Sequence, residues 1–95
     1  MHDGTDKERF TKVFEEENDA LFRFCLWRTT DHERAVEFTQ ETFARLWQEM
    51  VSGKKVPNPR AFLFLVAKRI IIDWYRRKKP LSLDMPIEGE EKRMP

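Results

Sequence analysis

The sequence is poor in several features that mark other classes of protein. Its 95 residues contain one cysteine, three glycines and one tyrosine. The single Cys25 excludes an internal disulfide framework, and a lone cysteine in a reducing cytoplasm is typically a small buried hydrophobic residue. The longest apolar run, residues 61–67, is too short to span a membrane. The first four residues are polar and acidic, unlike a secretory signal. These absences predict a soluble cytoplasmic domain that contacts no membrane.

Signatures of metal and catalytic sites are also missing. His2 and His32 are isolated in the sequence, and the chain has no zinc-type spacing, glycine-rich phosphate loop or nucleophile–base pair. We therefore expect neither a cofactor nor an enzymatic activity.

The residues that are present favour a small helical core with an uneven charge. Hydrophobic residues make up 40% of the chain and aromatic residues 13%, enough for one domain of three or four helices. The net charge is only +1, but residues 54–79 carry nine basic side chains against Asp73 alone. Residues 1–53 are acidic on balance. This layout predicts two different partners, with the basic segment serving as a phosphate-binding surface.

Two helical regions are predicted in the first half of the chain. Thr5 and Glu8 form a capping box for the first, and the polar residues 16–19 predict either two helices or one helix with a break. Thr30 and Glu33 form a second capping box, before a helix that ends at residues 52–53. Its core-facing positions step by three and four: Ala35, Phe38, Thr39, Thr42, Phe43, Leu46, Trp47 and Met50.

Residues 51–59 predict a loop, because they contain two prolines and one glycine. Asn58 and Pro59 then provide an N-cap and a first helical residue. Residues 60–79 lack glycine and proline, and we expect a helix there, although the runs 63–66 and 70–72 would also suit strands. The predicted core stripe is Leu63, Val66, Ala67, Ile70, Ile71 and Trp74. The other face mixes bulky apolar and charged groups: Phe62, Phe64, Leu65, Lys68, Arg69, Ile72, Asp73 and Arg76.

The remaining residues predict a linker. Pro80 ends the helix, and residues 80–95 form an acidic stretch with no core of its own. We expect a helical domain over residues 1–79, followed by an extended linker that leads to a further domain.

Two segments together resemble a known family. Residues 35–47 resemble the A-E-D-L-V-Q-E-V-F-x-R-L-W signature of region 2 in bacterial sigma factors of the extracytoplasmic-function class. Residues 62–77 resemble the W-L-Y-R-I-A-R-N-x-x-I-D-Y-x-R-R helix of that family. The likeness covers about residues 8–79. Val36 and Glu37 replace the usual E-D, Phe62 replaces a tryptophan, and Arg69 replaces an asparagine that lies at the promoter DNA in this family.

The resemblance implies an all-α bundle of three to four helices that binds RNA polymerase core and melts the minus-ten promoter element. In this family the second long helix docks on the coiled coil of the β′ subunit. The matching positions here are Glu37, Gln40, Glu41 and Arg45. A solvated charged face is the alternative interpretation of these four residues. An anti-sigma factor is a further partner that the resemblance allows.

The loop and last helix would contact promoter DNA, especially the non-template strand of the minus-ten element. The candidates are Lys54, Lys55, Val56, Asn58, Arg60, Phe62, Lys68, Arg69, Asp73, Arg76, Arg77, Lys78 and Lys79. Trapping an unstacked base requires a pocket, apolar or aromatic platforms and nearby cations.

Simpler explanations stay open for some of these residues. Phe62 and Phe64 can belong to the core, and residues 76–79 can act only on the helix dipole. Asp73 can pair with Arg69 or Arg77.

Two other functional classes are open. A helix-turn-helix domain would have a tight turn instead of a nine-residue proline-rich loop. A helical protein-interaction adaptor would show no salt-dependent affinity for single-stranded DNA.

Overall fold

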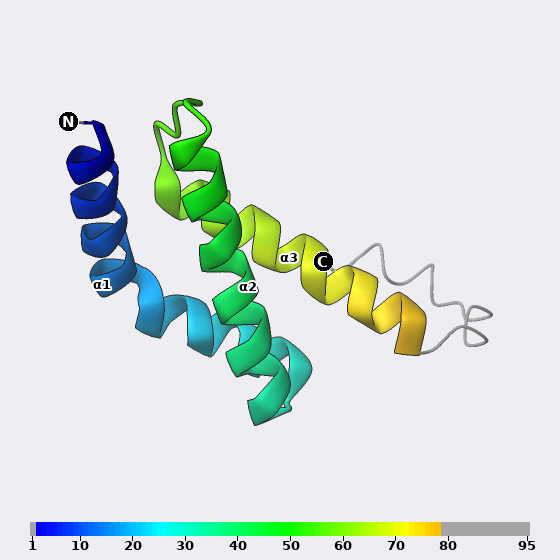
Figure 1. Ribbon diagram of the computed structural model, residues 1–95. Helices are drawn as coiled ribbons and strands as arrows, with labels where there is room; N and C mark the ends of the chain where they lie inside the picture. Colours follow the sequence, from blue (N-terminus) through cyan, green and yellow to red (C-terminus); the bar gives the residue numbers. More distant parts are fainter. Residues whose placement is uncertain (1, 79–95) are drawn as a thin grey trace.

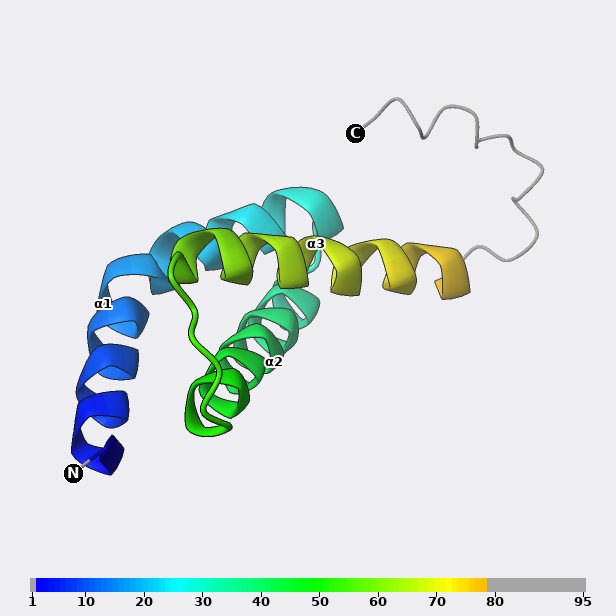
Figure 2. The same ribbon diagram turned by 90° about the horizontal axis from the view of Figure 1, so that it is seen from above.

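The described part of the chain, residues 2–78, forms three helices in the computed structural model, and side chains are described from residue 6 onward. Helix α1 spans His2–Thr29, α2 spans His32–Val51 and α3 spans Pro59–Lys78. All three pairs of helices are in contact. In Figures 1 and 2, α3 runs roughly parallel to the second half of α1 and crosses α2, and its C-terminal half extends beyond both. The domain is all-helical over these residues, as predicted. Lys79 and the predicted linker 80–95 lie outside them.

Helix α1 differs from the prediction at two points. It begins at His2, so Thr5 lies inside the helix and is not its cap. The helix also continues through residues 16–19, where two helices or a break were predicted. No glycine or proline interrupts this stretch, and Asp19 pairs with Arg23 at 3.0 Å, an i,i+4 contact that supports helix. The axis of α1 bends instead, as both ribbon views show (Figures 1 and 2).

The connection between α1 and α2 is a tight turn. Thr30 takes a left-handed conformation, with φ of 51°. The N-cap of α2 is Asp31, whose carboxylate accepts a hydrogen bond from the Arg34 amide at 3.2 Å. The predicted cap at Thr30 is therefore wrong by one residue, because a cap needs an extended backbone and Asp31 has it.

The core lies where the three helices meet. Its buried members are Leu21, Cys25, Ala35, Phe38, Phe43, Leu46, Met50, Val56, Leu63, Ala67 and Ile71. Burial raises the pKa of the Cys25 thiol, so this side chain stays neutral and acts as a small hydrophobic residue, as predicted. The core stripe of α2 is confirmed except for Trp47, whose side chain remains 36% exposed while its ring contacts Phe10 edge-on at 5.4 Å.

Three threonines are buried without leaving an unpaired hydroxyl. The hydroxyls of Thr29, Thr39 and Thr42 each donate to the backbone carbonyl four residues earlier, at 2.9, 2.7 and 2.7 Å. This local bond lets a polar residue occupy a core position of a helix.

Helix α3 begins where the sequence predicts. Asn58 caps it, because its side-chain oxygen accepts a hydrogen bond from the Ala61 amide at 3.1 Å, and Pro59 is the first helical residue. Residues 63–66 and 70–72 are helical, so the strand alternative is wrong. Within residues 2–78, no helix is both long and apolar enough to cross a membrane.

The loop between α2 and α3 is anchored in the core. Val56 is only 5% exposed and packs with the core residues of the helices. Residues 51–59 form a loop as predicted, but the predicted DNA-binding residue Val56 is part of the core. Its neighbours Lys55 and Pro57 are exposed.

Candidate functional site

The outer face of α2 presents the four predicted polymerase-binding residues to solvent. Glu37, Gln40, Glu41 and Arg45 are all exposed. Glu37 pairs with Arg34 at 2.9 Å, and Glu41 pairs with Arg45 at 2.8 Å. Exposed pairs of this kind contribute at most about 0.5 kcal/mol, so a binding partner can exchange them at little cost.

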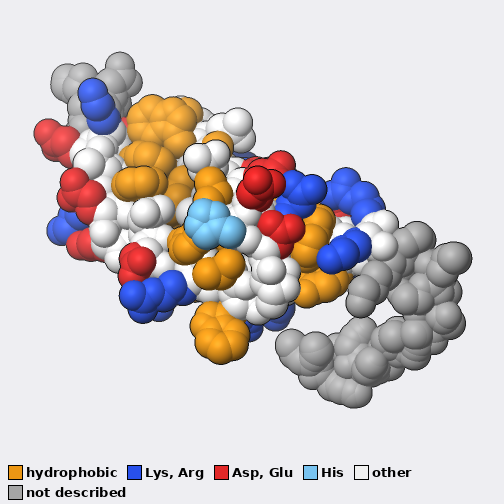
Figure 3. Space-filling model, turned by 90° about the horizontal axis from the view of Figure 1, so that it is seen from below, with side chains coloured by type: hydrophobic (Ala, Val, Ile, Leu, Met, Phe, Trp, Pro, Cys, Tyr) orange, Lys and Arg blue, Asp and Glu red, His pale blue; other side chains and the backbone are white. Residues whose placement is uncertain are grey.

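An open groove of about 800 Å³ lies between α2 and α3. The side chains from α2 that line it are Arg34, Glu37, Phe38, Glu41 and Arg45. Those from α3 are Arg69, Ile70, Asp73, Trp74, Arg77 and Lys78. In Figure 3, acidic and basic side chains lie beside apolar ones to the right of the pale blue histidine. The groove joins residues predicted for two separate partners, since Glu37, Glu41 and Arg45 share it with Arg69, Asp73 and Arg77.

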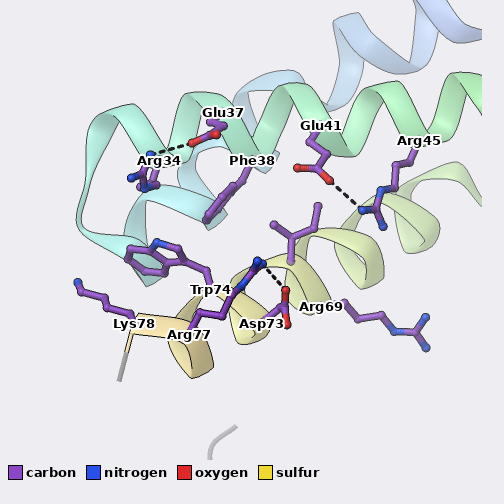
Figure 4. Close-up of a pocket in the computed structure, with 11 residues that line it drawn as sticks. Arg34, Glu37, Phe38, Glu41, Arg45, Arg69, Asp73, Trp74, Arg77 and Lys78 are labelled. Carbon is purple, nitrogen blue, oxygen red and sulfur yellow. Dashed lines mark hydrogen bonds and ion pairs between the residues drawn. The ribbon is translucent and has the colours of Figure 1, made fainter. Parts of the chain in front are cut away.

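Each carboxylate of the groove has an arginine partner. Besides the two pairs on α2, Asp73 pairs with Arg77 on α3 (Figure 4). Asp73 thus takes one of its two predicted partners. Lys78 lies over the Trp74 ring, 4.6 Å from its centroid. Arg69 makes no ion pair within residues 6–78, and in Figure 4 its side chain points away from the carboxylates, leaving its cation free for a ligand.

The outer side of α3 carries apolar groups that the core does not use. Leu65 is 48% exposed and Ile72 41% exposed, two helical turns apart. Lys68 and Arg76 are exposed at helical spacing on the same side, and neither forms an ion pair within residues 6–78. A stripe of alternating apolar and cationic side chains can hold bases and phosphates of a nucleic-acid strand together.

The loop residues divide into two groups. Lys54 and Lys55 are exposed, and Lys54 lies 3.7 Å from Glu49. Val56 and Asn58 have structural roles, in the core and as the cap of α3. Val56 is therefore not available to line a pocket for a base in this conformation.

Two predicted DNA-binding residues at the start of α3 make contacts within the domain. Arg60 pairs with Glu17 of α1 and lies over the Phe64 ring, 4.8 Å from its centroid. Phe62 is half-buried against the core, and so is Phe64, whose ring contacts Phe24 edge-on at 5.1 Å. Both rings therefore pack against the core while part of each remains exposed.

The basic residues at the end of α3 point in different directions. Arg77 and Lys78 line the groove, whereas Arg76 does not. They lie about 30 Å from the loop, given the rise of a 20-residue helix. A strand stacked as in duplex DNA, with 3.4 Å per nucleotide, would touch both ends with about nine nucleotides, and an unstacked strand would need fewer.

Sequence reasoning missed several lining residues. Arg34 was detectable from its i,i+3 spacing to Glu37. Phe38, Ile70 and Trp74 were assigned only to the core, and the sequence carries no signal that their edges also form the floor of a groove.

Comparison with known proteins identifies the family. The model described as Sigma-70 region 2 matches residues 13–80. The protein named "ECF RNA polymerase sigma factor SigL" in Mycobacterium tuberculosis strains Erdman, CDC 1551 and H37Rv is 39% identical over 62 residues. This match covers 64% of the present chain and 35% of the relative, so the chain spans about a third of the length of the curated relatives it matches. The chain belongs to the sigma-70 region 2 family, and it is similar to extracytoplasmic-function members of that family.

Proposed function

We propose that this domain binds RNA polymerase core through α2 and recognises and melts the minus-ten promoter element through the loop and α3. The observation that carries the proposal is the exposed stripe on α3, where Leu65 and Ile72 alternate with basic residues that form no ion pair within residues 6–78. Apolar and cationic side chains that alternate on one side of a helix provide the two kinds of contact that a single nucleic-acid strand requires.

Promoter melting requires that unpaired bases be held more tightly than paired ones. Apolar side chains on α3 provide surfaces for unstacked bases, while Lys68, Arg69 and Arg76 neutralise nearby phosphates. Lys54 and Lys55 add positive charge at the loop. The rigid anchoring of the loop by Val56 and Asn58 fixes its position relative to α3, and preorganisation of this kind reduces the entropy lost on binding.

Polymerase docking and DNA binding use neighbouring faces of the molecule in this proposal. The two faces meet at the groove, where Glu37, Glu41 and Arg45 of α2 lie opposite the basic residues of α3. Gln40 is exposed on α2 and does not line the groove, whereas Arg69 and Arg77 face it from α3. The groove carries five cations and three carboxylates, so its excess charge is positive. It lies between the two surfaces and places the melted strand close to the polymerase.

The polymerase-binding face can be tested with a charge-reversing double variant. Gln40→Lys with Glu41→Ala should weaken binding to polymerase core or to an isolated β′ coiled coil by at least about 10-fold, the scale of one or two lost charged hydrogen bonds. Stability should change by no more than about 0.5 kcal/mol, because both side chains are exposed. Pull-down and thermal unfolding measure the two quantities.

The same helix offers a matched control. Gln48 and Glu49 repeat the residue pair eight positions later, and Gln48→Lys with Glu49→Ala makes the same charge change. We expect this control to retain binding. Unchanged pull-down by the Gln40/Glu41 variant would show that this face does not dock the polymerase.

Base preference tests the role of the loop. Exchanging Lys54, Lys55 and Pro57 for other residues of equal loop length, with Val56 and Asn58 kept, should leave the fold intact. If the loop reads an extruded base, the preferred base on otherwise identical single-stranded minus-ten oligonucleotides should change. The lost discrimination should be about 1–3 kcal/mol per base contact. Polymerase binding through Gln40 should be unaffected.

Identical preference profiles for the wild-type and exchanged loops would show that the loop reads no base. If the wild-type protein showed no salt-dependent affinity for any single-stranded DNA, the adaptor function would be favoured instead.

A further inference from the structure

The end of α1 is fixed to α3, which makes their outer sides one surface. The Tyr75 hydroxyl donates a hydrogen bond to the Arg28 backbone carbonyl, and the Phe24 and Phe64 rings meet edge-on at 5.1 Å. Arg28 lies over the Phe24 ring, 4.0 Å from its centroid. These contacts tie the last two turns of α1 to the helix that carries the basic and apolar stripe.

Trp27 projects from this junction into solvent. Its side chain is 79% exposed, more than any other large hydrophobic residue in the described part of the chain. It follows Phe24 by three residues and therefore lies about 60° around the helix from it, on the side away from the core. This indole is not packed in the core, although a buried tryptophan would remove roughly 150–250 Å² of surface from water.

The surroundings of Trp27 have the chemistry of a site for a single nucleic-acid strand. Arg28 is exposed and forms no ion pair within residues 6–78, whereas Arg23 is engaged by Asp19 at 3.0 Å. On α3, Tyr75, which bonds to the Arg28 carbonyl, is 38% exposed, and Ile72, three residues earlier, is 41% exposed. A flat aromatic group next to an arginine without an ion pair, on a helix fixed to the basic helix α3, favours stacked bases and phosphates over an acidic or purely apolar protein partner.

We propose that Trp27 is a stacking platform for an unpaired base of the DNA strand that α3 holds, with Arg28 contacting an adjacent phosphate. This inference rests on the proposed function and extends the DNA surface from α3 onto α1. Any base can stack on an indole, so Trp27 adds affinity for single strands and little sequence preference.

Intrinsic fluorescence and affinity test the assignment in the intact chain. A single-stranded oligonucleotide of at least about 12 nucleotides, long enough to cover α3, is titrated into wild type, Trp27→Phe and Trp47→Phe. Quenching should be smaller in Trp27→Phe than in wild type, with the remainder coming from Trp74 in the groove, and it should be unchanged in Trp47→Phe, because Trp47 packs on Phe10 away from α3. Trp27→Ala should lower affinity by about 10-fold, and Trp27→Phe should restore most of it, because phenylalanine also stacks.

The results separate this inference from the proposed function. Full quenching in Trp27→Phe, or wild-type affinity in Trp27→Ala, would overturn the role of Trp27 while leaving the function of α3 standing. Loss of polymerase binding by Trp27→Ala with unchanged affinity for the strand would make this surface a protein contact instead. Failure of the wild-type protein to bind any strand would overturn both proposals. Thermal unfolding should be the same for all variants at position 27, since the side chain is exposed.

Discussion

Replacing Arg76, Arg77 and Lys78 together with glutamine should reduce the affinity for a single-stranded minus-ten oligonucleotide by about 100-fold at 0.1 M salt. Each phosphate contact contributes a slope of about 0.7 to the dependence of log affinity on log salt, so three contacts contribute about 2. The loss should be similar for all sequences, because phosphate contacts carry no base information. Affinity measured at several salt concentrations gives both the loss and the slope.

A control of equal charge comes from α1. Lys7, Arg9 and Lys12 are exposed, and replacing them with glutamine also removes three positive charges. This variant should keep most of its affinity, since the three residues belong to neither α3 nor the groove. An equal loss in both variants would mean that only net charge matters. A loss confined to one promoter sequence would move residues 76–78 from phosphate contact to base readout.

Some loss of stability is expected from the same change and must be measured alongside. The three cations lie in the last turn of α3, where each contributes about 0.3–1 kcal/mol through the helix dipole. Lys78 also lies over Trp74, and Arg77 pairs with Asp73. Binding should therefore be compared well below the melting temperature, where both proteins are fully folded.

Val56→Asp should abolish cooperative folding or nearly so. A carboxylate at this buried position has no cationic partner among the core residues, and burial of an unpaired charge costs several kcal/mol. A domain of this size has only about 4–12 kcal/mol of stability in total. Val56→Ala should remove about 2 kcal/mol and lower the melting temperature by about 10 °C. Circular dichroism during thermal unfolding measures both variants.

Lys55 provides the neighbouring control. Lys55→Asp places the same side chain one residue earlier at an exposed position, and we expect a change within about 0.5 kcal/mol. Val56→Asp with wild-type stability would contradict the anchoring of the loop. That result would mean that Val56 is free to contact a base.

Much of the fold was predictable because it depends on local spacing. Seven of the eight apolar positions predicted on α2 are buried, and α3 begins at Pro59 behind an Asn58 cap. Both features depend on residues within one or two helical turns of one another. The errors at Thr5, Thr30 and residues 16–19 are also local. Several polar residues at each of these places can cap a helix or continue it, and packing decides between these outcomes.

The sequence indicated which helices carry the candidate residues, but it did not indicate which of these side chains lie close together. The charge asymmetry and the two family motifs indicated α2 and α3 as the candidate functional helices. They did not indicate that Glu37 and Glu41 would share a groove with Arg69 and Arg77. Nor did they distinguish Arg60, which pairs with Glu17, from the basic residues that remain free.

The sequence by itself determined the helical class, the extent of α2 and α3, the charge of each and membership of the family. Helical periodicity, capping and composition are properties of neighbouring residues, so they can be recognised before folding is considered. Only the tertiary structure decided which predicted residues remain available to a partner. Val56 is buried, Arg60 meets a residue 43 positions away, and Trp27 stays exposed, because these outcomes depend on how the three helices cross. The crossing is set by the packing of side chains that are distant in sequence, which no local pattern encodes.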